Sequence, residues 1–168
     1  MDTKKAITSQ YLATLEMMKQ VIEKCPDELW RNPTFTNPFW HIAYHALFYT
    51  HLYAQPEEAA FIPWEKNRPN ISGFGPPPRA PDEPWERGEP YSQAELLDYL
   101  AICQKEVSLH TSQLDPEAPS GFSWIPLNKL ELQFYNIRHL QLHIGELCER
   151  LWAEAGIEVG WVGKFPND

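Results

Sequence analysis

The sequence predicts an all-α protein, a four-helix bundle with a long proline-rich crossover between its second and third helices. Four segments place apolar side chains at the three- and four-residue spacing of one helix face, and no long segment has the composition of β-strands. Nine of the sixteen prolines lie between positions 56 and 90. The length of 168 residues fits a single domain spanning 1–168, with the crossover at 56–90 as part of it.

The first helix is expected from about Thr3 to Cys25, where Pro26 ends it. Its apolar face is formed by Ile7, Tyr11, Leu15, Met18 and Ile22. The second helix is expected to have Asn37 as its N-cap and Pro38 in its first helical position, and to run to Pro56 through a segment rich in aromatic residues.

The crossover carries the segment GFGPPPRAP and shows no helical or strand period. Its aromatic residues predict that it packs onto the bundle, and we expect Trp64, Phe74 or Trp85 to cover the functional site as part of a gate. Its length also allows the third helix to return parallel to the second. Helices one and two, and helices three and four, are expected to be antiparallel neighbours because short connections join them.

The third helix is expected from Ser92 to about Leu114, because Ser92 and Glu95 form a capping-box pattern. The fourth and longest helix is expected from about Leu127 to Ala155. Gly156 then stands where a left-handed C-cap residue is favoured.

Charge and composition exclude several classes of partner. Lys and Arg number 14 against 23 Asp and Glu, which gives a formal net charge of -9, and no basic cluster occurs. Neither nucleic acid nor a membrane surface is therefore expected as a partner, and no apolar run is long enough to span a bilayer. The three cysteines are widely spaced and indicate unpaired thiols, so we expect a cytoplasmic protein.

Two pairs of histidines suggest a metal site. His139 and His143 in HLQLH, and His41 and His45 in HIAYH, are each four residues apart and share the inward face of their helix. Hydrogen-bonded core histidines would also explain one such pair, but several buried imidazoles need a common partner, and a metal ion supplies it. The lack of clustered cysteines or carboxylates argues against a closed zinc site or a di-iron centre and favours one Zn, Ni or Fe ion.

The segments FWHIAYHALF and HLQLHIGEL, together with the order of the helices along the whole chain, resemble the DinB-like superfamily of metal-binding four-helix bundle proteins. The resemblance implies that His45, His139 and His143 ligate the metal, with His41 as the alternative first ligand one turn away. His110 has no counterpart among the ligands of the family and is expected to be a core or pocket-lining residue.

Three histidine ligands leave an open coordination position, which is typical of catalytic metal sites. The resemblance implies a metal-dependent enzyme, either a hydrolase or a thiol-dependent S-transferase. Its partners would be a small-molecule substrate, including a low-molecular-weight thiol, and a second copy in a homodimer. Glu146 is the candidate general base or orienting group, although it could instead simply pair with Arg150. Asn136 could bind a ligand or a histidine. A non-catalytic metal sensor or interaction protein is the alternative function.

Overall fold

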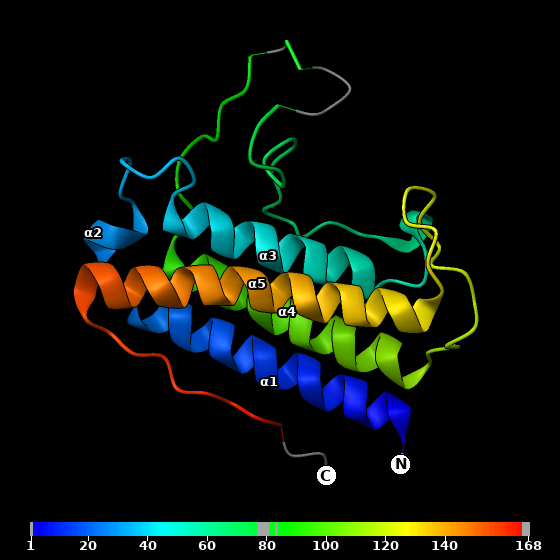
Figure 1. Ribbon diagram of the computed structural model, residues 1–168. Coiled ribbons are helices and arrows are strands. Elements are labelled where there is room, and N and C mark those ends of the chain that lie inside the picture. The colour runs from blue at the N-terminus through cyan, green and yellow to red at the C-terminus, as the bar shows by residue number, and fades with distance from the viewer. Residues whose placement is uncertain (1, 77–80, 83, 166–168) are drawn as a thin grey trace.

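A computed structural model describes residues 2–76, 81–82 and 84–165 of the protein and shows four long helices with two short ones (Figure 1). The elements are α1 (Thr3–Lys24), α2 (Asp27–Trp30), α3 (Phe39–Ala54), the 3-10 helix η1 (Glu58–Ala60), α4 (Gln93–Ser112) and α5 (Lys129–Ala155). Within the described residues, β structure is limited to one isolated bridge between Pro119 and Asn128. The predicted all-α bundle with a long crossover is confirmed.

Local sequence signals explain most helix ends. The Ser92 hydroxyl accepts a hydrogen bond from the Glu95 amide while the Glu95 carboxylate accepts one from the Ser92 amide, so the predicted capping box starts α4. Gly156 ends α5 at a φ of 65°, a backbone conformation that glycine adopts without a steric penalty.

The start of α3 differs from the expectation. Pro38, not Asn37, is the N-cap, because its ψ of 154° is extended and its carbonyl accepts the first helical hydrogen bonds. Proline fixes only φ, so the sequence did not reveal on which side of the helix boundary Pro38 lies. The short helix α2, directly after Pro26, was also not expected.

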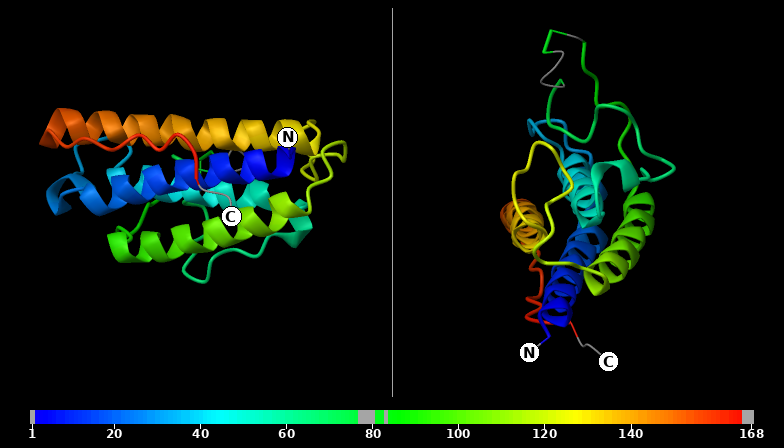
Figure 2. Two further views of the ribbon diagram at one scale, coloured as in Figure 1. Left: turned by 90° about the horizontal axis from the view of Figure 1, so that it is seen from below. Right: turned by 90° about the vertical axis from the view of Figure 1, so that its right-hand side faces the viewer.

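The order of the helices around the bundle corrects another expectation. Seen end-on, the order is α3, α5, α1 and α4 (Figure 2), and the main packing pairs are α1 with α4 and α5, and α3 with α4 and α5. The helix pairs joined by short connections, α1 with α3 and α4 with α5, are therefore diagonal, so predicting them as neighbours was wrong. Their antiparallel direction and the parallel run of α3 and α4 are as expected (Figure 1).

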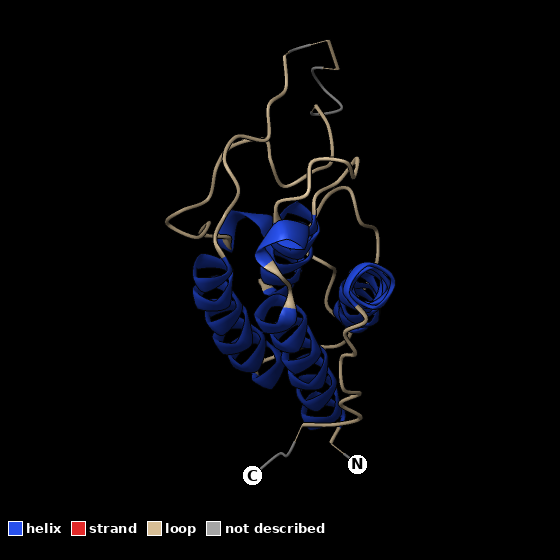
Figure 3. Ribbon diagram, turned by 90° about the vertical axis from the view of Figure 1, so that its left-hand side faces the viewer, coloured by secondary structure: helices blue, strands red, loops and turns tan. Residues whose placement is uncertain are grey.

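The crossover leaves the bundle on the side of α3, where most loop segments gather (Figure 3). Its first part packs into the core: Trp64 is buried and its ring stacks on Tyr99 with a centroid distance of 4.7 Å. Its last part is held by the Trp30 indole, which donates to the Tyr91 carbonyl at 2.8 Å. The crossover is thus fixed at both ends, which determines where its middle part meets α3.

The remaining features concern the chain ends and the cysteines. The segment after α5 runs back along α1, where the Gln20 side chain accepts a hydrogen bond from the Gly160 amide at 3.0 Å. Cys25, Cys103 and Cys148 are unpaired, as expected. Among the described helices, none combines the length and apolar character required to cross a membrane.

Candidate metal centre

Three histidines from two packed helices meet between α3 and α5. His45 lies on α3, and His139 and His143 lie one turn apart on α5. Their potential ligand nitrogens all lie within 4.8 Å of one another. The Nε2 atom of His139 is 3.2 Å from Nε2 of His45 and 3.2 Å from Nε2 of His143. Nitrogens that share a tetrahedral zinc ion at about 2.05 Å are themselves about 3.3 Å apart, so these separations suit chelation of one ion.

Hydrogen bonds fix which ring nitrogen carries the proton in two of the three histidines. The Nδ1 of His45 lies 2.6 Å from the carbonyl oxygen of Ser72, which only accepts, so the proton is on Nδ1. The Nδ1 of His143 likewise faces a carboxylate oxygen of Glu146 at 3.4 Å. In both residues the Nε2 atom therefore presents a lone pair toward His139.

This arrangement cannot be satisfied by the histidines alone. A neutral His139 has one ring proton, so its Nε2 donates to at most one of the two neighbouring lone pairs, and the other pair of nitrogens repel each other. Its Nδ1 is buried and has no hydrogen-bond partner among the described residues. A cation among the three Nε2 atoms removes this conflict, so the donor set fits a metal ion.

Burial keeps the three imidazoles neutral. Desolvation is the main cause that lowers the pKa of His45 from 6.5 to about 3 and that of His139 to about 4, and the neighbouring imidazoles contribute to both shifts. Desolvation also lowers the pKa of His143, although the nearby Glu146 opposes that shift. Neutral imidazole is the form that ligates metals, so the lone pairs are available at neutral pH.

Aromatic rings enclose the histidine group. Phe74 of the crossover stacks on His45 at a centroid distance of 4.1 Å and meets His143 edge-on at 5.8 Å. Tyr49 of α3 contacts His45 at 4.8 Å and His139 at 5.6 Å. Of the three aromatic residues expected to cover the site, Phe74 touches it; Trp85 contacts His41 instead, and Trp64 belongs to the core. Positions 77–80 of the GFGPPPRAP segment lie outside the described residues.

His41 lies beside the group and is fully engaged elsewhere. Its Nε2 donates to the Ile71 carbonyl at 2.7 Å, and its Nδ1 accepts from Nε of Arg87 at 2.9 Å. Arg87 also donates to the Thr36 carbonyl at 2.6 Å. Both ring nitrogens of His41 are therefore occupied, which leaves His45 as the member of this pair that faces α5.

His41 and His45 together tie the crossover to α3. Their N–H groups, one helical turn apart, donate to the carbonyls of the consecutive residues Ile71 and Ser72. The bond that fixes the proton of His45 is thus supported by the neighbouring bond and, through His41, by Arg87. Sequence reasoning missed Arg87 and both carbonyls, because nothing in an aperiodic loop indicates which of its groups reaches a helix 30 residues away.

Glu146 makes both of the contacts expected of an orienting or ion-paired residue. One carboxylate oxygen faces Nδ1 of His143, and the other accepts from Nη2 of Arg150 at 2.8 Å. Arg150 in turn donates to the Asn37 carbonyl at 2.7 Å. The carboxylate therefore lies behind a candidate ligand, in a position suited to orienting His143.

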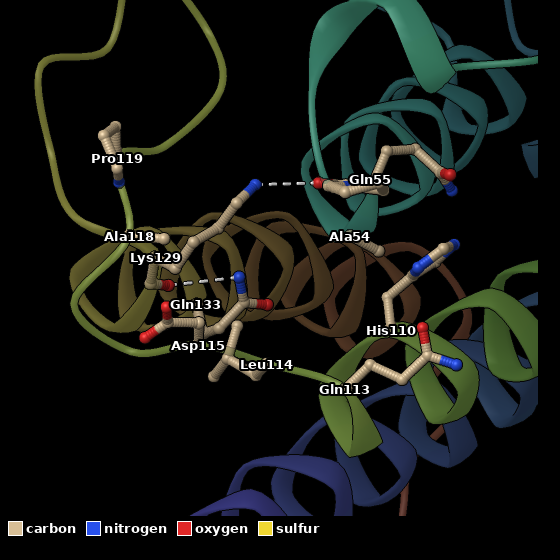
Figure 4. A pocket seen from close by; sticks show the side chains of 11 residues that line it. Ala54, Gln55, His110, Gln113, Leu114, Asp115, Ala118, Pro119, Lys129 and Gln133 are labelled. Carbon is tan, nitrogen blue, oxygen red and sulfur yellow. Dashed lines mark hydrogen bonds between the residues drawn. The ribbon is translucent and has the colours of Figure 1, made fainter.

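The other polar candidates have partners outside the group. Asn136 is buried and donates to the Thr50 carbonyl at 3.1 Å. His110 lies at 3.2 Å from Glu106 and lines a pocket of about 300 Å³ at the opposite end of α3 (Figure 4). Figure 4 also shows Lys129 spanning that pocket to donate to the Gln55 carbonyl at 3.0 Å. His110 is a pocket-lining residue, as expected.

A comparison with protein families gives a match over most of the chain. The family model described as the DinB superfamily matches residues 10–147, well over half of the 168-residue chain. The matched span includes all three histidines of the group. Neither the curated proteins nor the solved structures gave a match.

Proposed function

The chain belongs to the DinB superfamily, and we propose that it is a metal-dependent enzyme that holds one divalent ion, Zn, Ni or Fe, through Nε2 of His45, His139 and His143. The observation that carries the proposal is the convergence of three Nε2 atoms. In His45 and His143 a hydrogen bond at Nδ1 holds the proton there, so that Nε2 presents a lone pair. Imidazole donors without thiolates are compatible with each of these three metals.

An open coordination position supports catalysis over a purely structural site. Within the described residues the ligand group has three members, and structural zinc sites normally have four protein ligands. When bound, such an ion acts as a Lewis acid toward water, a carbonyl or a thiol. A fourth protein ligand would instead favour the non-catalytic sensor.

The protein's own residues provide orientation and a dry surrounding. Ser72 and Glu146 hold the rings of His45 and His143, each through the nitrogen remote from the group. Phe74 stacks on the ring face of His45 and Tyr49 meets His139 edge-on, so both place apolar surface against the group. Because Glu146 is held by Arg150 and acts through His143, we assign it a positioning role and not that of the general base.

The reaction is either hydrolysis of a small molecule or transfer to a low-molecular-weight thiol. In the second case the thiol must come from the co-substrate. Burial raises the pKa of Cys25 to about 12, raises that of Cys103 still further and also raises that of Cys148, which disfavours a thiolate at all three cysteines. We place this activity in the cytoplasm, where low-molecular-weight thiols stay reduced.

Metal content tests the proposal directly. Protein purified under native conditions should contain about one ion per chain, and His139→Ala and His143→Ala should each reduce it to near zero because two imidazoles hold an ion far less tightly. His110→Ala is the matched control, since it removes a histidine from the other pocket, and it should retain full metal content. Full occupancy in either ligand variant would refute the triad.

Turnover separates enzyme from sensor. The metal-loaded protein is assayed with small esters and amides, and with small electrophiles in the presence and absence of a thiol. Activity that disappears with the metal supports the proposal, and the thiol requirement distinguishes transferase from hydrolase. A fourth protein ligand in a metal-bound structure, with no turnover, would support the sensor.

A further inference from the structure

The pocket of about 300 Å³ beside His110 is separate from the histidine group. It lies where the C-terminal ends of α3 and α4 meet the N-terminal end of α5 (Figure 4). Its volume is that of roughly ten water molecules, which is enough for a small organic ligand. His45, His139 and His143 are not among the residues that line it, so the proposed metal chemistry makes no use of this pocket.

Lys129 brings a buried positive charge to this pocket. The residue is 7% exposed, and its side chain spans the pocket so that Nζ donates to the Gln55 carbonyl at 3.0 Å (Figure 4). Nζ also lies 5.4 Å from the centroid of the Phe122 ring. An ammonium group carries three N–H donors. After the bond to Gln55, two donors therefore remain that no acceptor among the described residues takes up.

The chain supplies no close counter-charge for this ammonium. Within the described residues, no carboxylate oxygen lies within 4.0 Å of Nζ. Asp115 lines the pocket, but it is exposed and accepts a hydrogen bond from the Glu117 amide at 3.2 Å. Glu57, whose charge favours the ammonium, is exposed as well, and desolvation still lowers the pKa of Lys129. An anion inside the pocket offsets the cost of burying this charge.

The walls of the pocket favour an anion that has an apolar body. Ala54 at the end of α3, Leu114 just after α4 and Pro119 in the next connection all line the cavity. Figure 4 shows His110 on the side of α4 and Lys129 on the side of α5. A ligand whose negative group contacts Lys129 therefore extends its apolar body toward the end of α4.

The start of α5 argues against phosphate as the anion. A helix N-terminus binds phosphate through free backbone N–H groups. Here the amides of the first two residues of α5 donate to carbonyls of the preceding connection at 2.8 and 3.2 Å. The Glu131 amide donates to Oδ1 of Asn128 at 2.8 Å. With these amides occupied, the ammonium of Lys129 is the donor that remains, and it suits a single negative charge such as a carboxylate.

We propose that this pocket binds a small monocarboxylate with a short apolar body, whose carboxylate accepts hydrogen bonds from Nζ of Lys129. Hydrogen bonds between an ammonium and a carboxylate are roughly twice as strong as those between neutral groups. A ligand of roughly six to ten non-hydrogen atoms matches the cavity. It contacts α3, α4 and α5 together and so stabilises this end of the bundle.

Isothermal titration calorimetry of the metal-loaded full chain tests the site, with butyrate and benzoate as probes. Each should bind saturably to one site per chain. Butyramide and benzamide match these probes in size but lack the charge, so they should bind at least about tenfold more weakly. No saturation by either carboxylate at about 10 mM, or equal binding of acids and amides, would overturn the proposal.

Lys129→Met tests the role of the ammonium. The variant keeps most of the side-chain length, and its affinity for both carboxylates should fall by about tenfold or more while its affinity for the amides stays unchanged. Lys105→Met is the matched control, because it removes a positive charge from an exposed position of α4 outside the pocket, and it should bind as the wild type does. Unchanged carboxylate affinity in Lys129→Met, with a native near-ultraviolet circular dichroism spectrum, would refute the site.

Ala118→Leu keeps the ammonium and tests the cavity, which decides the question if Lys129→Met does not fold. Ala118 lines the pocket and is half-buried, so leucine narrows the available space. The affinity for benzoate should fall by about tenfold because the ring no longer fits, whereas the smaller acetate should keep its affinity. Benzoate binding as tight as in the wild type would contradict the proposed location.

Two further measurements identify where the anion binds and which anion is preferred. His139→Ala should bind benzoate with wild-type affinity, because the pocket does not depend on the metal. Loss of binding in this variant would place the carboxylate at the metal and overturn the proposal. Inorganic phosphate should bind at least about tenfold more weakly than butyrate, since burying a second negative charge is costly. Tighter binding of phosphate would likewise overturn the proposal, and neither failure would affect the histidine triad.

Discussion

His45, His139 and His143 direct three Nε2 atoms at one another, whereas His51 and His110, nearer the C-terminal ends of α3 and α4, each have a protein partner. The Tyr99 hydroxyl lies 3.3 Å from Nδ1 of His51, and Glu106 lies 3.2 Å from Nε2 of His110. Both groups are at least partly buried, so burial alone does not distinguish a ligand from a structural histidine. The distinction is whether the chain itself supplies enough donors and acceptors.

The largest expected difference between the two groups is the effect of metal on stability. Adding Zn to metal-free protein should raise the free energy of unfolding by about 4 kcal/mol at a metal concentration about 1,000 times the dissociation constant. His139→Ala should abolish this gain, and His110→Ala should retain it. Thermal or denaturant unfolding with and without metal measures the difference, and an equal gain in both variants would contradict the comparison.

Acidification of the metal-free protein should act next most strongly. The pKa of His41 and of His139 is about 4 in the folded protein, and that of His45 is about 3, against 6.5 when unfolded. Because the unfolded chain binds these protons first, the free energy of unfolding should fall as the pH drops below about 6.5, and the fall should continue toward pH 4.

The slope of the free energy of unfolding against pH tests whether His41 resists protonation in the folded protein. His41→Phe removes one buried titrating group and should flatten the slope, although it also lowers the overall stability by leaving the Ile71 carbonyl without its donor. Denaturant unfolding at several pH values measures it. A slope unchanged by this variant would mean that His41 does not resist protonation.

A smaller effect is expected where the crossover supports the site. Arg87→Met keeps much of the side-chain length but removes the donor to His41, and it should weaken metal binding by about tenfold because the support of His45 loosens. Lys66→Met is the control on the same crossover, since Lys66 makes an exposed ion pair with Glu95. Competition with a chelator measures both affinities, and equal losses would argue against a positioning role.

The smallest effect is expected from Glu146→Gln. The amide oxygen can still accept from Nδ1 of His143, so metal affinity should fall by only roughly threefold. Glu106→Gln makes the same change beside His110 and should leave the affinity unchanged. If Glu146→Gln instead abolished turnover while preserving affinity and its dependence on pH, Glu146 would be a general base and not a positioning residue.

The sequence predicts the helices better than their arrangement. Apolar spacing, the Ser92 capping box and Gly156 are local signals, and they locate the long helices to within a few residues. Connection lengths fixed the directions of the helices but did not distinguish adjacent from diagonal positions, so the order around the bundle was predicted wrongly. That order depends on which side chains interlock across the core, which a single sequence does not reveal.

In the candidate site, too, some residues could be predicted from the sequence and others could not. The four-residue spacing of His139 and His143 made their proximity predictable, and the resemblance selected His45 over His41. The groups that orient the histidines include Ser72 and Arg87 of the crossover, and no periodic pattern in that loop predicts their contacts with α3. Inward-facing histidines can therefore be predicted from the sequence, but the tautomers that allow their Nε2 atoms to ligate a metal cannot.

The attachment of the crossover at Ile71, Ser72 and Arg87 has a consequence for protein engineering. Ile71 and Ser72 on one side and Arg87 on the other are hydrogen-bonded to His41 and His45 of α3. Pro81 and Asp82, which lie between these anchors, are exposed, and exposed positions between anchored ones are suitable places to insert foreign sequence. A fluorescent reporter or a peptide tag placed there would be joined on both sides to residues that contact His41 and His45.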